Sequence, residues 1–158
     1  MLDIINIAII VLLALAPGLE VRASIPYGVL LGFNPLGVFL LSYIMSCLPS
    51  IPIIYLLGWV EENLVPRYDI LQKLYNWAIK RVRKKLEEIR RSKYIFLALA
   101  AYVAIPLPLT GVWTGSLIAY LLGLDRKKSI LAIIMGNIVA STIVLLASLG
   151  LLHIAGFL

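Results

Sequence analysis

The sequence predicts an all-α integral membrane protein built as an inverted-topology repeat, and three observations carry that prediction. The 158 residues are 62% hydrophobic, with a mean hydropathy of +1.02. Residues 23–60, 94–124 and 129–158 contain no Asp, Glu, Lys or Arg. Each of these runs exceeds the roughly 20 apolar residues that a membrane-crossing helix needs. The same order of apolar segments, backbone breaks and turns also occurs twice, which divides the single membrane domain, 1–158, into two halves.

The first repeat, residues 1–59, starts with an apolar arm that is too short to cross a membrane. Its elements in order are the arm Ile4–Ala16, a Pro/Gly-rich break at Pro17–Gly28, the apolar segment Val29–Phe33, the turn Asn34-Pro35 and a helix at Leu36–Trp59. The arm would measure about 20 Å as a helix, against a bilayer core of roughly 30 Å. We therefore expect the arm to turn back as a re-entrant hairpin and the last helix to span, with kinks at Pro49 and Pro52.

The two repeats are joined by a basic segment, residues 60–93, with ten Lys/Arg and five Asp/Glu. Between Pro66 and Ser92, apolar residues recur at spacings of three and four while charged residues fill most other positions, which predicts an amphipathic helix. We expect this helix, 66–92, to lie on the cytoplasmic leaflet, as an orienting anchor or as a reader of anionic lipid headgroups.

The second repeat, residues 94–158, follows the same plan. Its elements in order are the arm Tyr94–Ile105, a break at Pro106–Gly115, the apolar segment Ser116–Leu124, the turn Asp125–Lys128 and a helix at Ser129–Gly156. A shift of 91 residues superimposes Pro17 on Pro108 and Asn34 on Asp125. The arm is again short, so a second re-entrant hairpin and one spanning helix are expected.

The positions of the basic loops favour this topology over one in which every apolar run crosses. With re-entrant hairpins, both basic loops fall on the cytoplasmic side, as the positive-inside rule prefers. Each half then makes an odd number of crossings, so the halves are inverted and both termini lie outside. The broken tips meet near the midplane, a plan that recurs in secondary transporters.

Composition argues against several other classes of protein. The net charge of +6 is concentrated in the basic loops, and no nucleic-acid-binding motif is visible, so we expect no nucleic-acid partner. Walker motifs, metal-ligand spacings and nucleophile–base pairs are absent from the sequence. We therefore expect no metal, no cofactor and no enzymatic activity. The single cysteine, Cys47, is interpreted as a packing residue.

Glu20 and Arg22 are the principal candidates for a functional site, because ionisable groups at bilayer depth are costly and usually mark function. One interpretation is a proton-titratable carboxylate beside a cation that binds an anion bidentately. The alternative is structural, with Arg22 snorkelling to the surface and Glu20 capping the return helix.

The remaining candidate residues come from both tips and from the spanning helices. The substrate- or proton-binding set is Glu20, Arg22, Ser24, Pro26, Pro106, Pro108, Thr110, Gly111, Trp113, Thr114, Gly115 and Asn137. The 91-residue shift pairs Ser46 with Asn137, for which helix–helix hydrogen bonding is favoured over a transport pathway.

Two motifs together resemble a known family. They are E-x-R-x-x-I-P at Glu20–Pro26 and I-P-x-P-x-T-G-x-W-x-G-S at Ile105–Ser116, and they are similar to the putative small multidrug export protein family of prokaryotes. The resemblance extends to the wider DedA-type (VTT-domain) superfamily, whose members are thought to pair two re-entrant hairpins and to move lipids or lipid carriers. The sequence departs from the pattern at Leu109, where glycine is expected, and lacks the DedA arginine of the second hairpin.

We expect a multi-pass transport protein of a prokaryotic plasma membrane, acting as a homodimer. The leading hypothesis is translocation of a lipid or lipid carrier through a midplane site, with proton coupling left open. The alternatives are export of small, multidrug-type compounds, in which Glu20 binds a cation, and a non-transport membrane scaffold.

Overall fold

The computed structural model describes residues 2–75, 87 and 92–154. In these residues the chain is helical and contains no strand. The helices in chain order are α1 (Leu2–Leu15), α2 (Glu20–Leu30), α3 (Pro35–Cys47), α4 (Ser50–Asn63), the 3₁₀ turn η1 (Val65–Arg67), α5 (Asp69–Tyr75), α8 (Ile95–Ala104), α9 (Val112–Leu121) and α10 (Arg126–Ile154).

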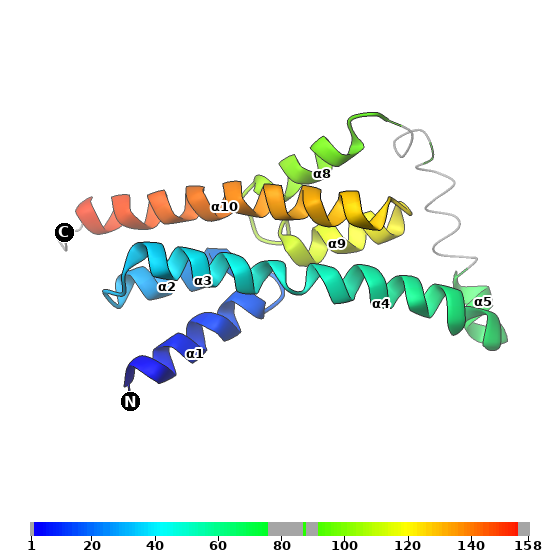
Figure 1. The fold of residues 1–158 in the computed structure, drawn as a ribbon, viewed down its shortest axis with the longest axis horizontal. Helices are drawn as coiled ribbons and strands as arrows, with labels where there is room; N and C mark the ends of the chain where they lie inside the picture. Colours follow the sequence, from blue (N-terminus) through cyan, green and yellow to red (C-terminus); the bar gives the residue numbers. More distant parts are fainter. Residues whose placement is uncertain (1, 76–86, 88–91, 155–158) are drawn as a thin grey trace.

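Two long rods form the frame of the molecule, and they run antiparallel along its longest axis (Figure 1). One rod is α10, whose 29 residues give a length of about 44 Å, enough to cross a bilayer core of roughly 30 Å. The other is α3 followed by α4, which are separated only at Leu48 and Pro49. Both rods are long and apolar enough to span a membrane. The α3–α4 rod is thus interrupted at Pro49, close to the predicted kinks at Pro49 and Pro52, and the bend itself stays a prediction.

Two helical hairpins pack against this frame, each near one end. The α1–α2 hairpin lies toward the end that carries both chain termini, and the α8–α9 hairpin lies toward the opposite end (Figure 1). Their connecting turns approach one another near the middle of the rods. Helices α1 and α8 have 14 and 10 residues, or about 21 and 15 Å, which is less than the thickness of a bilayer core.

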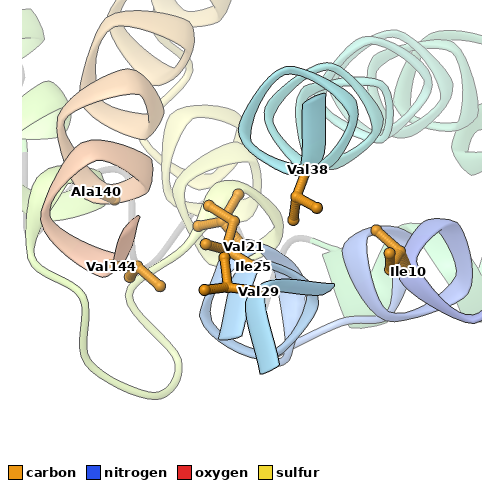
Figure 2. Packing of buried hydrophobic residues seen from close by; sticks show 7 residues of the cluster. All are labelled: Ile10, Val21, Ile25, Val29, Val38, Ala140 and Val144. Carbon is orange, nitrogen blue, oxygen red and sulfur yellow. The ribbon is translucent and has the colours of Figure 1, made fainter. Parts of the chain in front are cut away.

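Each hairpin has its own apolar core. In the first, Ile10, Val21, Ile25, Val29, Val38, Ala140 and Val144 bring α1, α2, α3 and α10 together (Figure 2). The second core joins α4, α8, α9 and α10 around Val103, Val112 and Ile133. Glycines let the helices approach closely: a Cβ at Gly28 would lie 2.7 Å from Val38, and one at Gly115 would lie 2.7 Å from Val103.

The outer surface is largely apolar, as expected for a surface in contact with lipid. Large hydrophobic side chains are exposed on both rods and both hairpins, among them Ile4 at 72%, Leu36 at 63%, Leu97 at 67% and Leu146 at 64%. In soluble proteins, large exposed apolar patches are rare. The exposed side chains and the two long apolar helices agree with the predicted membrane protein.

Local backbone features recur 91 residues apart. The rod α3–α4 covers residues 35–63 and α10 covers 126–154. Helices α2 and α9 both end in a Schellman motif, with the N–H of Phe33 donating to Gly28 and that of Leu124 donating to Ala119. The next helices are capped by Asn34 and Asp125, whose side chains accept backbone N–H bonds.

The predicted lengths of both backbone breaks need correction. The break expected at Pro17–Gly28 is confined to residues 16–19, and helix α2 already begins at Glu20. The break at Pro106–Gly115 likewise ends before Val112. Pro26 and Gly115 lie inside helices, where the proline costs one backbone hydrogen bond and the glycine allows close packing.

The linker helix begins later than predicted. Tyr68 is extended, so α5 starts at Asp69 instead of at Pro66. An acidic residue in the first turn of a helix is favoured by the helix dipole. Most of the predicted amphipathic helix 66–92 lies outside the described residues.

Candidate functional site

The two hairpin turns meet through a buried carboxylate. The side chain of Glu20 is 1% exposed and lies at the start of α2. Its Oε2 atom accepts the backbone N–H of Val112 at 3.0 Å, and its Oε1 atom accepts that of Trp113 at 3.2 Å. Glu20 therefore caps α9, the return helix of the other hairpin, and its charge faces the positive end of that helix.

Helix α9 needs this partner because its own sequence supplies no cap. Gly111 occupies the N-cap position and offers no side chain to accept the free N–H groups. Its missing Cβ also provides the necessary room, since a Cβ there would lie 1.8 Å from Oε2 of Glu20. A larger residue at position 111 would therefore collide with the side chain of Glu20, which lies 91 positions away in the sequence.

Arg22 pairs with Glu20 and extends across to the same turn. Its Nη1 donates to Oε2 of Glu20 at 3.0 Å. Its Nη2 donates to the carbonyl of Ile105 and to Oγ1 of Thr110, both at 3.1 Å. The carbonyl of Ile105 follows the end of α8, so Arg22 supplies positive charge where the helix dipole is negative.

Thr110 and Trp113 complete the contacts between the turns. The Thr110 hydroxyl lies 2.6 Å from the carbonyl of Ile105 and 2.7 Å from that of Leu107, so it can donate to either while accepting from Arg22. The indole N–H of Trp113 donates to the carbonyl of Leu15 at 3.1 Å. Each return helix thus donates a side-chain hydrogen bond to the end of the other hairpin's first helix, Arg22 to α8 and Trp113 to α1.

The backbone at the turns is strained at two residues that are not glycine. Glu20 has φ +48° and Leu109 has φ +67°. Such conformations cost an L-residue about 1–2 kcal/mol and collect at functional sites. Leu109 stands 91 residues after Gly18, which adopts φ +81° at no steric cost. Leu109, where the family motif leads us to expect glycine, therefore has the left-handed backbone conformation that glycine adopts most easily.

A cavity of about 520 Å³ opens beside Arg22. It runs between α2, the Pro106 turn and the C-terminal part of α10, and it includes Pro26, Ile143 and Leu151 in its lining. The Arg22 side chain is 12% exposed, and among the described residues its Nε atom is buried without a hydrogen-bond partner. This volume is within the range of small-molecule sites, roughly 300–1,000 Å³.

The other candidate residues are distributed as follows. Pro108 and Thr114 lie in the turn and the first part of α9 without a contact that links them to Glu20. Ser24 bonds the carbonyl of Glu20 within its own helix, and Gly115 packs against Val103. The structure thus brings Glu20, Arg22, Thr110, Gly111 and Trp113 together and leaves Ser24 and Gly115 in packing positions.

Asn137 belongs to a separate polar cluster between the two rods. Its Nδ2 donates to Oγ of Ser46 at 2.7 Å and to Sγ of Cys47 at 3.2 Å. The predicted hydrogen bond between Ser46 and Asn137 is confirmed. Cys47 has a polar contact that the sequence did not indicate. Among the described residues, the Oδ1 atom of Asn137 is buried without a partner.

Sequence reasoning found the charged pair and gave helix capping by Glu20 as its structural alternative. It did not foresee that the capped helix, α9, belongs to the other hairpin, or that Trp113 contacts Leu15. A signal was present, because α9 begins at a glycine and lacks a capping side chain of its own. In the described residues, no group of three or more His, Cys, Asp or Glu side chains could hold a metal ion.

Comparison with known proteins identifies the family. Residues 20–143 match the family model described as "Putative small multi-drug export protein". No curated protein and no solved structure is similar enough to the chain to count as a match. The matched region starts at Glu20 and includes the Glu20–Arg22 pair, the rod α3–α4, the α8–α9 hairpin with its turn, and α10 as far as residue 143. The chain therefore belongs to the putative small multi-drug export protein family, and it is a membrane protein.

Proposed function

We propose that the protein is a transporter that moves a lipid or lipid carrier through a midplane site between two re-entrant hairpins. The observation that carries the proposal is the Glu20–Arg22 pair, which joins the two hairpin turns and borders a cavity of about 520 Å³. A buried ion pair is weak evidence for stability and is costly in a membrane, so a functional reason for keeping it is favoured.

The proposed topology follows from the short hairpins and the charge distribution. The hairpins approach from opposite ends of the rods, and the backbone features that recur at 91 residues support an inverted repeat (Figure 1). With the basic loops in the cytoplasm of a prokaryotic cell, both termini lie outside. Two long helices leave little protein to enclose a cargo, which favours a homodimer.

Proton coupling is part of the proposal, with Glu20 as the proton carrier. When Glu20 is ionised, its charge is balanced by Arg22 and by the start of α9. Protonation would leave Arg22 as an uncompensated cation in a medium of low dielectric constant, which favours the entry of an anionic headgroup. Proton and headgroup would then occupy the site together. The relationship to DedA-type proteins stays a prediction.

Reconstitution into liposomes tests this function. We expect the wild type to move a fluorescent phospholipid or polyprenyl phosphate between leaflets, and Glu20→Gln and Arg22→Ala to abolish the movement. A pH gradient across the vesicle should change the rate in the wild type. Wild-type rates in both variants would contradict the mechanism.

The family description supports a second candidate, the export of small compounds. An exporter would confer drug resistance that depends on Glu20, without moving lipid. A membrane scaffold is the third candidate, supported by the complete hydrogen bonding of the Glu20 carboxylate. A scaffold would lose thermal stability in both variants while moving no cargo at all.

A further inference from the structure

The cavity beside Arg22 has the chemistry of a site for an amphiphile. Its lining is apolar except at two residues, Arg22 and Ser148, among those that the structure describes. The Ser148 hydroxyl donates to the carbonyl of Val144 in its own helix. Arg22 is therefore the group that remains to recognise a polar part of a ligand, while the rest of the wall suits an alkyl chain.

The position of Arg22 gives the cavity a polar end and an apolar end. Arg22 lies in the first turn of α2 and Pro106 in the turn after α8, where the two hairpins meet, whereas Leu151 and Leu152 lie in the last turn of α10. That end of α10 is on the side of the chain termini (Figure 1). An amphiphile bound along this cavity with its headgroup at the guanidinium would lay its alkyl chain between α2 and α10, toward Leu151 and Leu152. In the described residues the Nε–H of Arg22 is buried and has no acceptor, so the guanidinium beside the cavity keeps one unsatisfied donor.

The carboxylate of Glu20 is not placed to attract a cation into the same cavity. Both of its oxygens accept backbone N–H bonds, one also accepts Nη1 of Arg22, and the side chain is 1% exposed. Glu20 is also not among the residues that line the cavity. The charged group that lines the cavity is therefore the guanidinium of Arg22, which is paired with Glu20 outside the lining.

A second groove, related to the first by the 91-residue shift, is uncharged. Its volume is about 430 Å³, and it lies at the joint of α3 and α4. Leu15, Pro52 and Trp113 line it at the positions that correspond to Pro106, Ile143 and Arg22 of the first cavity. The two grooves share three equivalent lining positions, and the exchange of arginine for tryptophan at one of them leaves a cation in the first groove but not in the second.

We propose that the first cavity binds a single-chain anionic amphiphile, an alkyl chain that ends in a carboxylate or phosphate, with its headgroup at Arg22. This inference rests on the proposed transport function and narrows its cargo: anions bind, and cationic drugs of equal chain length do not. The uncharged groove accepts the alkyl chain but has no cation to hold the headgroup. Tight binding is therefore restricted to the cavity beside Arg22.

Spin-labelled probes in nanodiscs of neutral lipid test the proposal. Doxyl-stearate is the anionic probe, and an alkyltrimethylammonium with the same label and chain length is the cationic probe. We expect the wild type to immobilise a larger fraction of the anionic probe than of the cationic probe, and this difference is the anionic excess. Arg22→Gln should lower the anionic excess about tenfold, the scale of a hydrogen bond between charged groups, whereas Arg22→Lys should keep part of it.

A second variant keeps the test decisive even when Arg22→Gln fails to fold. Ala147 lines the cavity from an exposed position on α10, so Ala147→Trp fills it without disturbing the core. Leu146→Trp is the matched control, because Leu146 is 64% exposed on the same helix and does not line the cavity. Only Ala147→Trp should release the anionic probe. Millimolar inorganic phosphate should leave the probe bound, since the chain is required.

Three results would overturn the inference. They are equal immobilisation of both probes, preference for the cationic probe, and an unchanged anionic signal in Ala147→Trp. Displacement of the probe by inorganic phosphate alone would show a site for free anions and would also contradict it. Anion-selective binding without any transport would leave the inference standing and defeat the proposed function instead.

Discussion

The carboxylate of Glu20 caps the helix that begins at Val112, with Oε2 at 3.0 Å from the backbone nitrogen. A residue of the first hairpin thus completes the first turn of the second hairpin's return helix. The contact joins parts of the chain that are 92 residues apart. The proposed site and the packing of the two hairpins therefore depend on the same atoms.

Gly111→Ala should destabilise the protein strongly. The new Cβ would lie 1.8 Å from Oε2 of Glu20, so the carboxylate must leave its two backbone N–H groups. We expect a loss of about 1.5–3 kcal/mol, the value of one hydrogen bond to a charged group, measured as thermal unfolding in detergent. Gly150→Ala is the control, because no atom lies within 4 Å of its Cβ. Equal melting temperatures for the two variants would contradict the capping role of Glu20.

Leu109→Gly should stabilise the protein. Leu109 has φ +67° and is 70% exposed, so glycine relieves backbone strain with little loss of packing. The expected gain is about 0.5–1 kcal/mol, after the greater freedom of glycine in the unfolded chain is subtracted. Leu107→Gly, at a residue of the same turn that is 57% exposed and has no positive φ, should bring no gain. A loss of stability in Leu109→Gly would argue against the left-handed turn.

Ser46 and Asn137 should be coupled energetically. A double-mutant cycle of Ser46→Ala and Asn137→Ala should give a coupling of about 0.6 kcal/mol, the average for hydrogen bonds between membrane helices. Unfolding in mixed micelles measures it. A parallel cycle of Thr142→Ala with Ser46→Ala should give no coupling, because Thr142 bonds the carbonyl of Ile138 in its own helix. Additive effects in the Ser46–Asn137 cycle would contradict the contact between the rods.

Much of the fold was predictable from the apolar pattern. The expected spanning segments, 36–59 and 129–156, correspond to the rods at 35–63 and 126–154. The end of each rod was harder to place, because Glu62 and Arg126 pair with each other at one end and so allow charged residues to remain helical. The lengths of the breaks were wrong, since Pro26 and Gly115 were interpreted as breakers. Pro26 lies inside α2, and Gly115 lies inside α9, where it allows close packing against Val103 of α8.

The site was predictable in its residues but not in its contacts. Charge in an apolar sequence was sufficient to single out Glu20 and Arg22. Their partners Val112, Trp113 and Ile105 contribute backbone groups, which carry no sequence signal and become identifiable only when the hairpins are placed together. The cavity beside Arg22 likewise depends on the position of α10.

Sided labelling of two cysteines tests the central claim, that the hairpins enter from opposite faces and bring Glu20 and Arg22 to the midplane. Asn34 is exposed in the turn that follows α2, and Lys127 is exposed in the first turn of α10, directly after the turn that follows α9. Each is replaced by cysteine in a Cys47→Ser background, which keeps an acceptor for Asn137. In intact cells, a membrane-impermeant maleimide should label Asn34→Cys and should reach Lys127→Cys only after the cells are opened. Labelling of both cysteines from the same side would contradict the inverted arrangement and the midplane site with it.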